Sequence, residues 1–197
     1  MDAYAQALDQ LRDRGLLYRC FRTRSEVADA IGHAPHGPEK PFFGRPPAPD
    51  EEAERLASGA SFAWRLSIAA AEKALGGFSG LSFTDRDRGV MAADPWAAGD
   101  VVLARKDLGV AYHLAVVVDD AAAGVSLVVR GEDLLAACHV QRLLQALLGL
   151  PTPIYRHHRL IVGADGRRLA KRDRSETLRA LRAAGVTPEQ LRGELGL

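Results

Sequence analysis

The chain has 197 residues, 47% of them hydrophobic and 26% charged, which is ordinary for a soluble globular protein with its own core. The sequence contains neither an apolar run of the roughly 20 residues that a membrane helix needs nor the pattern of a signal peptide. We therefore expect a cytoplasmic protein with no membrane partner. Two distant cysteines, Cys20 and Cys138, argue against a disulfide framework, so no disulfide partner is expected.

Charge is distributed unevenly along the chain. The net charge is only +1, but residues 156–182 contain nine basic and three acidic side chains. Such an excess favours an anionic partner near the C-terminal end, although many charged segments are simply solvated.

The first hundred residues predict short elements around a loop. Apolar residues at helical spacing open the chain, and Gly15 is suited to end that helix. An extended piece, "LLYRCF", precedes a small helix with a polar cap at Thr23 or Ser25. Prolines make residues 32–50 a loop. Next, "EEAERLASG" predicts a helix, whereas "FAWRLSIAAAEKALGG" suits either a strand or a helix.

The second half alternates strands and helices. We predict a strand in "DVVLARKD" (100–107) and a pair of strands buried on both faces in "VAYHLAVVVDD" and "GVSLVVRG". The strongest helix, "EDLLAACHVQRLLQALLG", ends at Gly149. A strand in "RHHRLIVG", a helix capped by Ser175, and a last helix with a capping box at Thr187 and Gln190 follow. This order predicts an α/β fold.

Three candidate groups have ordinary structural interpretations. The adjacent His157 and His158 face opposite ways on a strand, which argues against a shared metal. We interpret Asp119–Asp120 as turn formers rather than as an acid/base pair. Cys138 lies on the apolar side of the long helix and reads as a small buried side chain.

Two basic features have functional interpretations beside ordinary ones. Arg130 ends a strand, where open α/β sheets bind ligands, and a guanidinium can grip a carboxylate with two hydrogen bonds. The alternative is a surface Arg paired with Glu132 or Asp133. The basic loop "GADGRRLAKR" could stabilise phosphate charge, or could simply be solvated.

Several blocks in fixed order add a resemblance. "AYHLAVVVDD", "GVSLVVRGEDLL" and "HVQRLLQALLGLPTPIYRHHRLIVGADGRRLAKR" resemble the second half of the glutamyl-tRNA synthetase catalytic core, a class I synthetase with a Rossmann-type fold. The "RRLAKR" loop resembles the family's Lys-Leu-Ser-Lys signature loop. The likeness is clear over about 99–175 and weaker over 1–98.

The resemblance implies site residues, cofactors and partners. Tyr112 and Arg130 stand where the family contacts glutamate, with Arg130 on the substrate carboxylate. Lys171 stands at the second lysine of the signature loop and is the expected catalytic contact to ATP phosphates, and Arg168 replaces the first lysine. ATP and glutamate would be substrates, Mg²⁺ is expected with ATP, and tRNA would accept the glutamate.

Departures from the family pattern imply a partial catalytic domain. The chain lacks the His-Ile-Gly-His signature and the early arginine and glutamate that bind the amino acid, so it is expected to begin inside that domain. The missing half should leave an exposed sheet edge or apolar patch, and hence self-association. Only Cys20 remains of the family's zinc ligands, and one thiolate cannot build a tetrahedral site, so we expect no metal.

The expected architecture is the C-terminal half of a class I Rossmann-type core with an inserted α+β acceptor-binding region. Residues 1–107 would hold the end of the first Rossmann half plus this insert, and residues 108–197 the second half with the signature loop. The chain ends 26 residues after Lys171, before any large anticodon-binding region. This is similar to the short glutamyl-Q tRNA(Asp) synthetases, which attach glutamate to queuosine. The alternatives are a truncated glutamyl-tRNA synthetase and a non-catalytic tRNA-binding module.

Overall fold

The structure is a computed structural model, and it describes residues 3–30, 41–105, 109–162 and 177–196. Contacts divide the chain into two compact units. Unit 1 comprises Met1–Arg130 and Leu134–His157, and unit 2 comprises Gly131–Asp133 and His158–Leu197. A domain boundary between residues 107 and 108 stays a prediction. No helix in the described part of the chain is long and apolar enough to cross a membrane.

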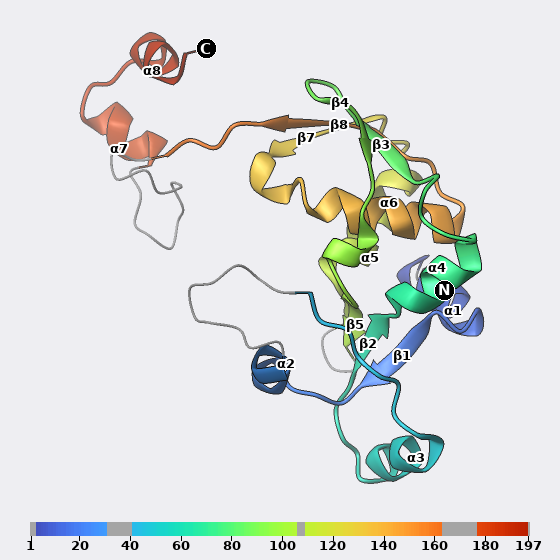
Figure 1. Cartoon of the computed structure of the whole chain (residues 1–197). Helices are drawn as coiled ribbons and strands as arrows, with labels where there is room; N and C mark the ends of the chain where they lie inside the picture. The colour runs from blue at the N-terminus through green and yellow to red at the C-terminus, as the bar shows by residue number, and fades with distance from the viewer. Residues whose placement is uncertain (1–2, 31–40, 106–108, 163–176, 197) are drawn as a thin grey trace. The chain divides into compact units, whose positions relative to one another are not determined.

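The first sheet of unit 1 is antiparallel and has the order β1-β2-β5-β6, of which β1, β2 and β5 are labelled in Figure 1. Strand pairing joins β1 to β2, β2 to β5 and β5 to β6. The strands are β1 (Leu17–Cys20), β2 (Ala63–Leu66), β5 (Val102–Arg105) and β6 (Gly109–Val110). The predictions of strands in "LLYRCF" and "DVVLARKD" are therefore confirmed.

The second sheet has the order β4-β3-β8-β7 and carries the candidate site. Its strands are β3 (Ser82–Asp85), β4 (Gly89–Ala92), β7 (Leu127–Gly131) and β8 (Ile154–His158). β3 and β4 form an antiparallel hairpin, whereas β3 and β8 run parallel. Because parallel strands end at the same edge, β3 and β8 bring their carboxyl ends together.

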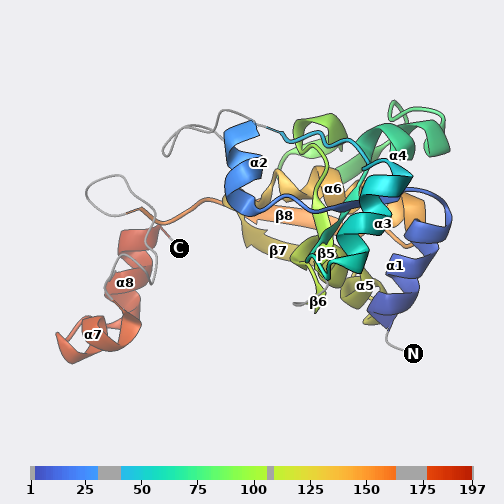
Figure 2. The same ribbon diagram turned by 90° about the horizontal axis from the view of Figure 1, so that it is seen from below.

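Three helices of unit 1 pack on one another and close its core (Figure 2). They are α1 (Ala3–Asp13), α5 (Tyr112–Ala122) and α6 (Ala137–Leu148). Their buried side chains form one apolar cluster with residues from both sheets, including Leu11, Leu66, Phe83, Leu103, Leu114, Leu143, Leu144 and Tyr155. A single cluster of this extent gives unit 1 one contiguous hydrophobic core. The expected α/β class is confirmed.

The remaining elements are short. Unit 1 contains α2 (Arg24–Ala30), α3 (Pro49–Ala57), α4 (Ile68–Leu75) and the 3-10 turn η1 (Pro95–Ala97). The turn η2 (Glu132–Leu134) links β7 to α6. Unit 2 contains α7 (Leu178–Ala183) and α8 (Pro188–Leu195). The ambiguous stretch "FAWRLSIAAAEKALGG" is both a strand and a helix, β2 followed by α4.

Local capping signals were read correctly in most places. The Thr187 side chain accepts from Gln190 N–H, and the Gln190 side-chain oxygen accepts from Thr187 N–H, which completes the expected capping box. Gly149 ends α6 with φ of 68°. Thr23 forms a similar reciprocal pair with Glu26 at the start of α2. The cap of α7 is Thr177 rather than Ser175, which lies outside the described residues.

Three predictions in the second half were wrong. Most of "VAYHLAVVVDD" is the helix α5 rather than a strand, because its buried Leu114, Val117 and Val118 recur at helical spacing. Asp119–Asp120 consequently lies inside this helix and not in a turn. β7 is not buried on both faces: Leu127 and Val129 are exposed at the end strand of the sheet. The self-association that the sequence led us to expect stays a prediction.

A buried carboxylate, Asp100, ties the described part of the proline-rich loop to the first sheet. It accepts hydrogen bonds from Tyr18 Oη at 2.8 Å, Gly44 N–H at 2.8 Å and Ile68 N–H at 2.9 Å. Its own backbone N–H donates to Phe42 O at 2.6 Å. Burial, and then the charge of Asp100, raise the pKa of Tyr18 far above its ordinary value. The tyrosine therefore remains a neutral donor to this carboxylate.

Candidate active site

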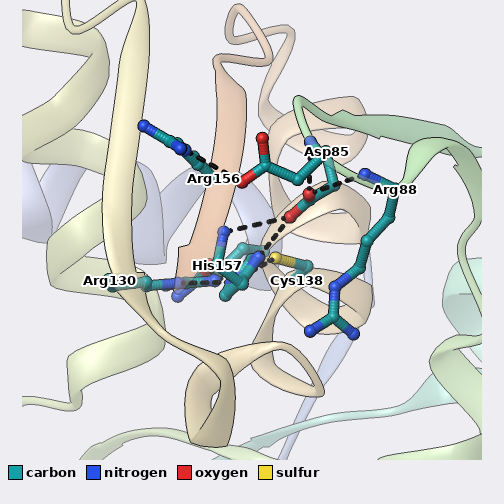
Figure 3. A network of polar contacts seen from close by, with 8 residues as sticks. Asp85, Arg88, Arg130, Cys138, Arg156 and His157 are labelled. Carbon is teal, nitrogen blue, oxygen red and sulfur yellow. Dashed lines mark hydrogen bonds and ion pairs between the residues drawn. The ribbon is translucent and has the colours of Figure 1, made fainter. Parts of the chain in front are cut away.

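Asp85, His157 and Arg130 lie in a row across three neighbouring strands (Figure 3). Asp85 ends β3, His157 lies near the end of β8, and Arg130 lies near the end of β7. Ile154 N–H donates to Ser126 O at the start of β8, so β7 and β8 advance together towards the same edge. The carboxyl edge of a parallel sheet is where α/β proteins bind ligands.

His157 joins the two charged members of this row. Its Nδ1 lies 2.6 Å from Asp85 Oδ2, and its Nε2 accepts from Arg130 Nε–H at 3.0 Å. Both Asp85 and His157 are buried, with exposed fractions of 0% and 4%. Because a guanidinium only donates, Nε2 must be the unprotonated nitrogen and Nδ1 the donor to Asp85. The geometry therefore selects the neutral Nδ1–H tautomer of His157.

Asp85 accepts four N–H groups. Oδ1 accepts from the backbone N–H of Asp87 at 3.0 Å and of Arg88 at 3.1 Å. Oδ2 accepts from the backbone N–H of His157 at 3.2 Å as well as from its ring. Burial would raise the pKa of Asp85, but the hydrogen bond from His157 and those from the backbone hold that pKa below its ordinary value. Asp85 is thus a buried carboxylate kept ionised by its donors.

Two of the three guanidinium nitrogens of Arg130, Nε and Nη2, contact buried side chains. Besides Nε, its Nη2 donates to Gln141 Oε1 and contacts Cys138 Sγ, both at 2.9 Å. The guanidinium carbon lies 5.2 Å from the centre of the Tyr155 ring. Burial above all raises the pKa of Cys138, so this thiol stays protonated beside the cation. Cys138 is therefore buried, as expected, but it also contacts the charged site.

Among the described residues, the partner of the third guanidinium nitrogen of Arg130, Nη1, is the half-exposed side chain of Tyr112. Tyr112 is the first residue of α5, is 50% exposed, and its Oη lies 3.4 Å from Nη1. Since Nε and Nη2 are already engaged, a two-bond grip on a carboxylate through that side of the guanidinium is not available. The sequence-based expectation of such a grip needs this correction. The arrangement offers instead Nη1 together with the Tyr112 hydroxyl.

A buried amide beside this cation lacks a partner. Gln141 is 2% exposed, and within the described part of the chain its Nε2 has no hydrogen-bond acceptor. An unsatisfied buried donor costs about 1–3 kcal/mol, so such groups persist chiefly where a ligand or water completes them. Gln141 Nε2 is therefore a buried donor beside Arg130 whose partner is not a side chain or backbone group of the described residues.

The structure brings two of the predicted site residues together, Tyr112 and Arg130. The other two, Lys171 and Arg168, lie outside the described residues. Sequence reasoning missed Asp85 and His157 as members of the site. His157 shares the buried face of β8 with Tyr155, which is a usable signal. The sequence analysis predicted no strand over Ser82–Asp85, so no strand pattern placed Asp85 at the end of a buried strand.

Comparison with known proteins places the chain. All of residues 1–197 match the family described as tRNA synthetases class I (E and Q), catalytic domain. The chain belongs to this family. It is 40% identical over 210 residues to the glutamyl-Q tRNA(Asp) synthetase of Rhodobacter capsulatus, covering 98% of this chain and 72% of that protein. It is 44% identical over 190 residues to the enzyme of that name from Nocardia farcinica, covering 95% and 57%.

Solved structures of this class share the fold. The crystal structure of glutamate-tRNA synthetase from Elizabethkingia anophelis aligns with a TM-score of 0.68 at 22% identity, covering 87% of this chain and 36% of that one. The family is one of ATP-using ligases. This chain spans little more than half the length of several curated relatives that it matches, such as the Symbiobacterium thermophilum protein at 59%.

Proposed function

We propose that the chain takes part in the ATP-dependent attachment of glutamate to the queuosine base of tRNA(Asp), through a glutamyl-adenylate. The observation that carries the proposal is the Arg130–Tyr112 pair at the carboxyl edge of the second sheet, in a chain about 40% identical to glutamyl-Q tRNA(Asp) synthetases. A fixed cation beside a hydroxyl donor suits one carboxylate of glutamate.

The site chemistry divides between two regions. Arg130 and Tyr112 would bind the amino acid, with the guanidinium supplying charge and the hydroxyl fixing the orientation. Lys171, the proposed catalytic residue, and Arg168 would contact the ATP phosphates as negative charge develops there. We also propose that Mg²⁺ accompanies ATP, that tRNA is the macromolecular partner, and that the protein acts in the cytoplasm.

We further propose that no zinc ion is bound by the region around Cys20. A structural zinc site needs four ligands, and Cys20 is a buried thiol whose family partners are replaced in "PFFGRPP". The hydrogen bonds of Asp100 with Tyr18 and Gly44 supply a different link between this segment and the sheet. If no zinc is bound, we expect the protein to fold equally well in the presence of a strong chelator.

Glutamate-dependent ATP–pyrophosphate exchange, followed by charging of purified tRNAs, tests the proposal. In the protein extended at its N-terminus by the His-Ile-Gly-His part, we expect exchange with glutamate but not aspartate, and charging of queuosine-bearing tRNA(Asp) in preference to tRNA(Glu). In that extended form, a Lys171→Ala change should abolish exchange because it removes the positive charge that contacts the ATP phosphates. Its control is Lys73→Ala, which changes the same residue type on α4, in the last turn of that helix.

The same experiment separates the alternatives. Charging of tRNA(Glu) alone would replace the proposal with a glutamyl-tRNA synthetase activity. Salt-sensitive retention of tRNA without any exchange would indicate a non-catalytic binding module, since phosphate contacts weaken steeply with salt. An exchange rate unaffected by Lys171→Ala would refute the role assigned to that lysine.

A further inference from the structure

The hydrogen-bonded row Asp85–His157–Arg130 has a buried end, Asp85, and a half-buried end, Arg130. Asp85 and His157 are separated by 72 residues in sequence, and His157 and Arg130 by 27. Asp85 is fully buried on the inner strand β3 and Arg130 is half-buried on the end strand β7, so the row runs along the carboxyl edge from the inside of the sheet to its end strand. No part of the proposed reaction requires Asp85 or His157 to touch a substrate.

The buried end requires a carboxylate and not merely a polar group of that shape. All four groups that approach the two oxygens of Asp85 are N–H donors. An asparagine has one oxygen and one NH₂ group, so in either orientation its NH₂ would face two donors. If that NH₂ faced His157, the ring would have to accept at Nδ1 and carry its proton on Nε2. That proton would then meet the Nε–H of Arg130.

We infer that Asp85 and His157 are positioning residues for Arg130. The carboxylate holds His157 as the Nδ1–H tautomer, and His157 Nε2 then fixes the guanidinium by its Nε–H. With Nη2 held by Gln141 and Cys138, rotation of the guanidinium is prevented and Nη1 is left beside Tyr112 Oη. The inference rests on the proposed function in one respect, that glutamate is the ligand that Nη1 receives.

The first test compares two aspartates of one turn, Asp85 and Asp87. Asp87 is about half-exposed and pairs with Arg156 Nε at 2.9 Å, so Asp87→Asn is the matched control for Asp85→Asn. In the protein extended at its N-terminus by the His-Ile-Gly-His part, we expect Asp85→Asn to raise the KM for glutamate about 10- to 100-fold, the loss of one charge-assisted bond, while the KM for ATP stays within about twofold. Asp87→Asn should change neither constant. Equal glutamate KM values in the two variants would overturn the inference.

The second test remains informative if Asp85→Asn does not fold. His157→Gln keeps an acceptor near the position of Nε2, whereas His157→Asn keeps a polar group near the position of Nδ1. Both lose the ring and its stacking on Tyr155 at 6.0 Å. Positioning of Arg130 predicts at least about fivefold tighter glutamate binding by His157→Gln than by His157→Asn. A purely structural role, satisfying Asp85, predicts the opposite order.

A spectroscopic readout separates this inference from the proposed function. Long-range ¹H–¹⁵N spectra of the full chain, with His157 assigned through its Gln variant, should show the Nδ1–H neutral tautomer at pH 7.5. Wild-type protein with its proton on Nε2 would overturn the inference whatever glutamate does. Absence of glutamate binding together with the Nδ1–H tautomer would instead refute the proposed ligand and leave the Asp85–His157–Arg130 order standing.

Discussion

Replacing Asp100 by asparagine removes an acceptor from a cluster that joins three segments of unit 1. Oδ2 accepts from both Tyr18 Oη and Gly44 N–H, and Oδ1 accepts from Ile68 N–H at the start of α4. An asparagine whose oxygen serves Ile68 places its NH₂ against Gly44 N–H. The tyrosine hydroxyl can rotate to accept, but the Gly44 donor is left unsatisfied in a buried site.

The structure sets the magnitude of this change. One unsatisfied buried donor costs about 1–3 kcal/mol, and the bond to Ile68 loses its charge assistance. We therefore expect Asp100→Asn to lower the free energy of unfolding by about 3 kcal/mol. Tyr18→Phe should cost about 2 kcal/mol, because only one donor is removed. The double variant should fall short of the sum by about 1 kcal/mol, since both changes break the same bond.

Urea denaturation followed by tryptophan fluorescence measures these values. The chain contains two tryptophans, Trp64 on β2 and Trp96 in η1, and both lie in unit 1. Asp13→Asn is the control, because Asp13 is an exposed partner of Arg12 and such pairs contribute little. A shift for Asp100→Asn no larger than that of the control would refute the reasoning, and so would strict additivity with Tyr18→Phe.

Three further predictions concern the frame of unit 1. Gly99→Ala should cost at least about 2 kcal/mol in unfolding free energy, because Gly99 has φ of +67° and an added Cβ would lie 2.6 Å from Phe42 O. Gly124→Ala is its control, with φ of +65° and open space, and equal losses would contradict the argument. Burial lowers the pKa of His139, whose Nδ1 accepts from Asp94 N–H, so the unfolded chain binds the proton more readily. Stability should be full above the ordinary value of 6.5 and fall as pH drops below it, and pH-dependent unfolding of a His139→Asn variant should show a shallower fall. Val129, 58% exposed on the end strand, should support concentration-dependent association that sedimentation detects and Val129→Lys reduces; unchanged association would place the contact elsewhere.

Local chemistry determined much of the chain from sequence alone. The capping box of α8, the left-handed glycine that ends α6 and the position of Arg130 near the end of a strand depend on residues a few positions apart. A hydroxyl three residues before its N–H donor caps a helix start, and a glycine that can take positive φ ends a helix, whatever the tertiary contacts of that helix are. The blocks that resemble synthetases are also local features, because each is a short stretch of sequence and the stretches occur in a fixed order along the chain.

The tertiary structure decided what depends on distant partners. The valines of α5 suit a strand as well as a buried helix, and only packing against α1 and α6 distinguishes the two. Asp85 meets His157 because β3 and β8 are neighbours in the sheet, a pairing that no local signal specifies. The sequence alone predicted the cation of the candidate site, Arg130, and its hydroxyl, Tyr112. The buried carboxylate and the imidazole tautomer that orient this cation follow from strand order, because hydrogen bonds across 27 and 72 residues exist only once the sheet has formed.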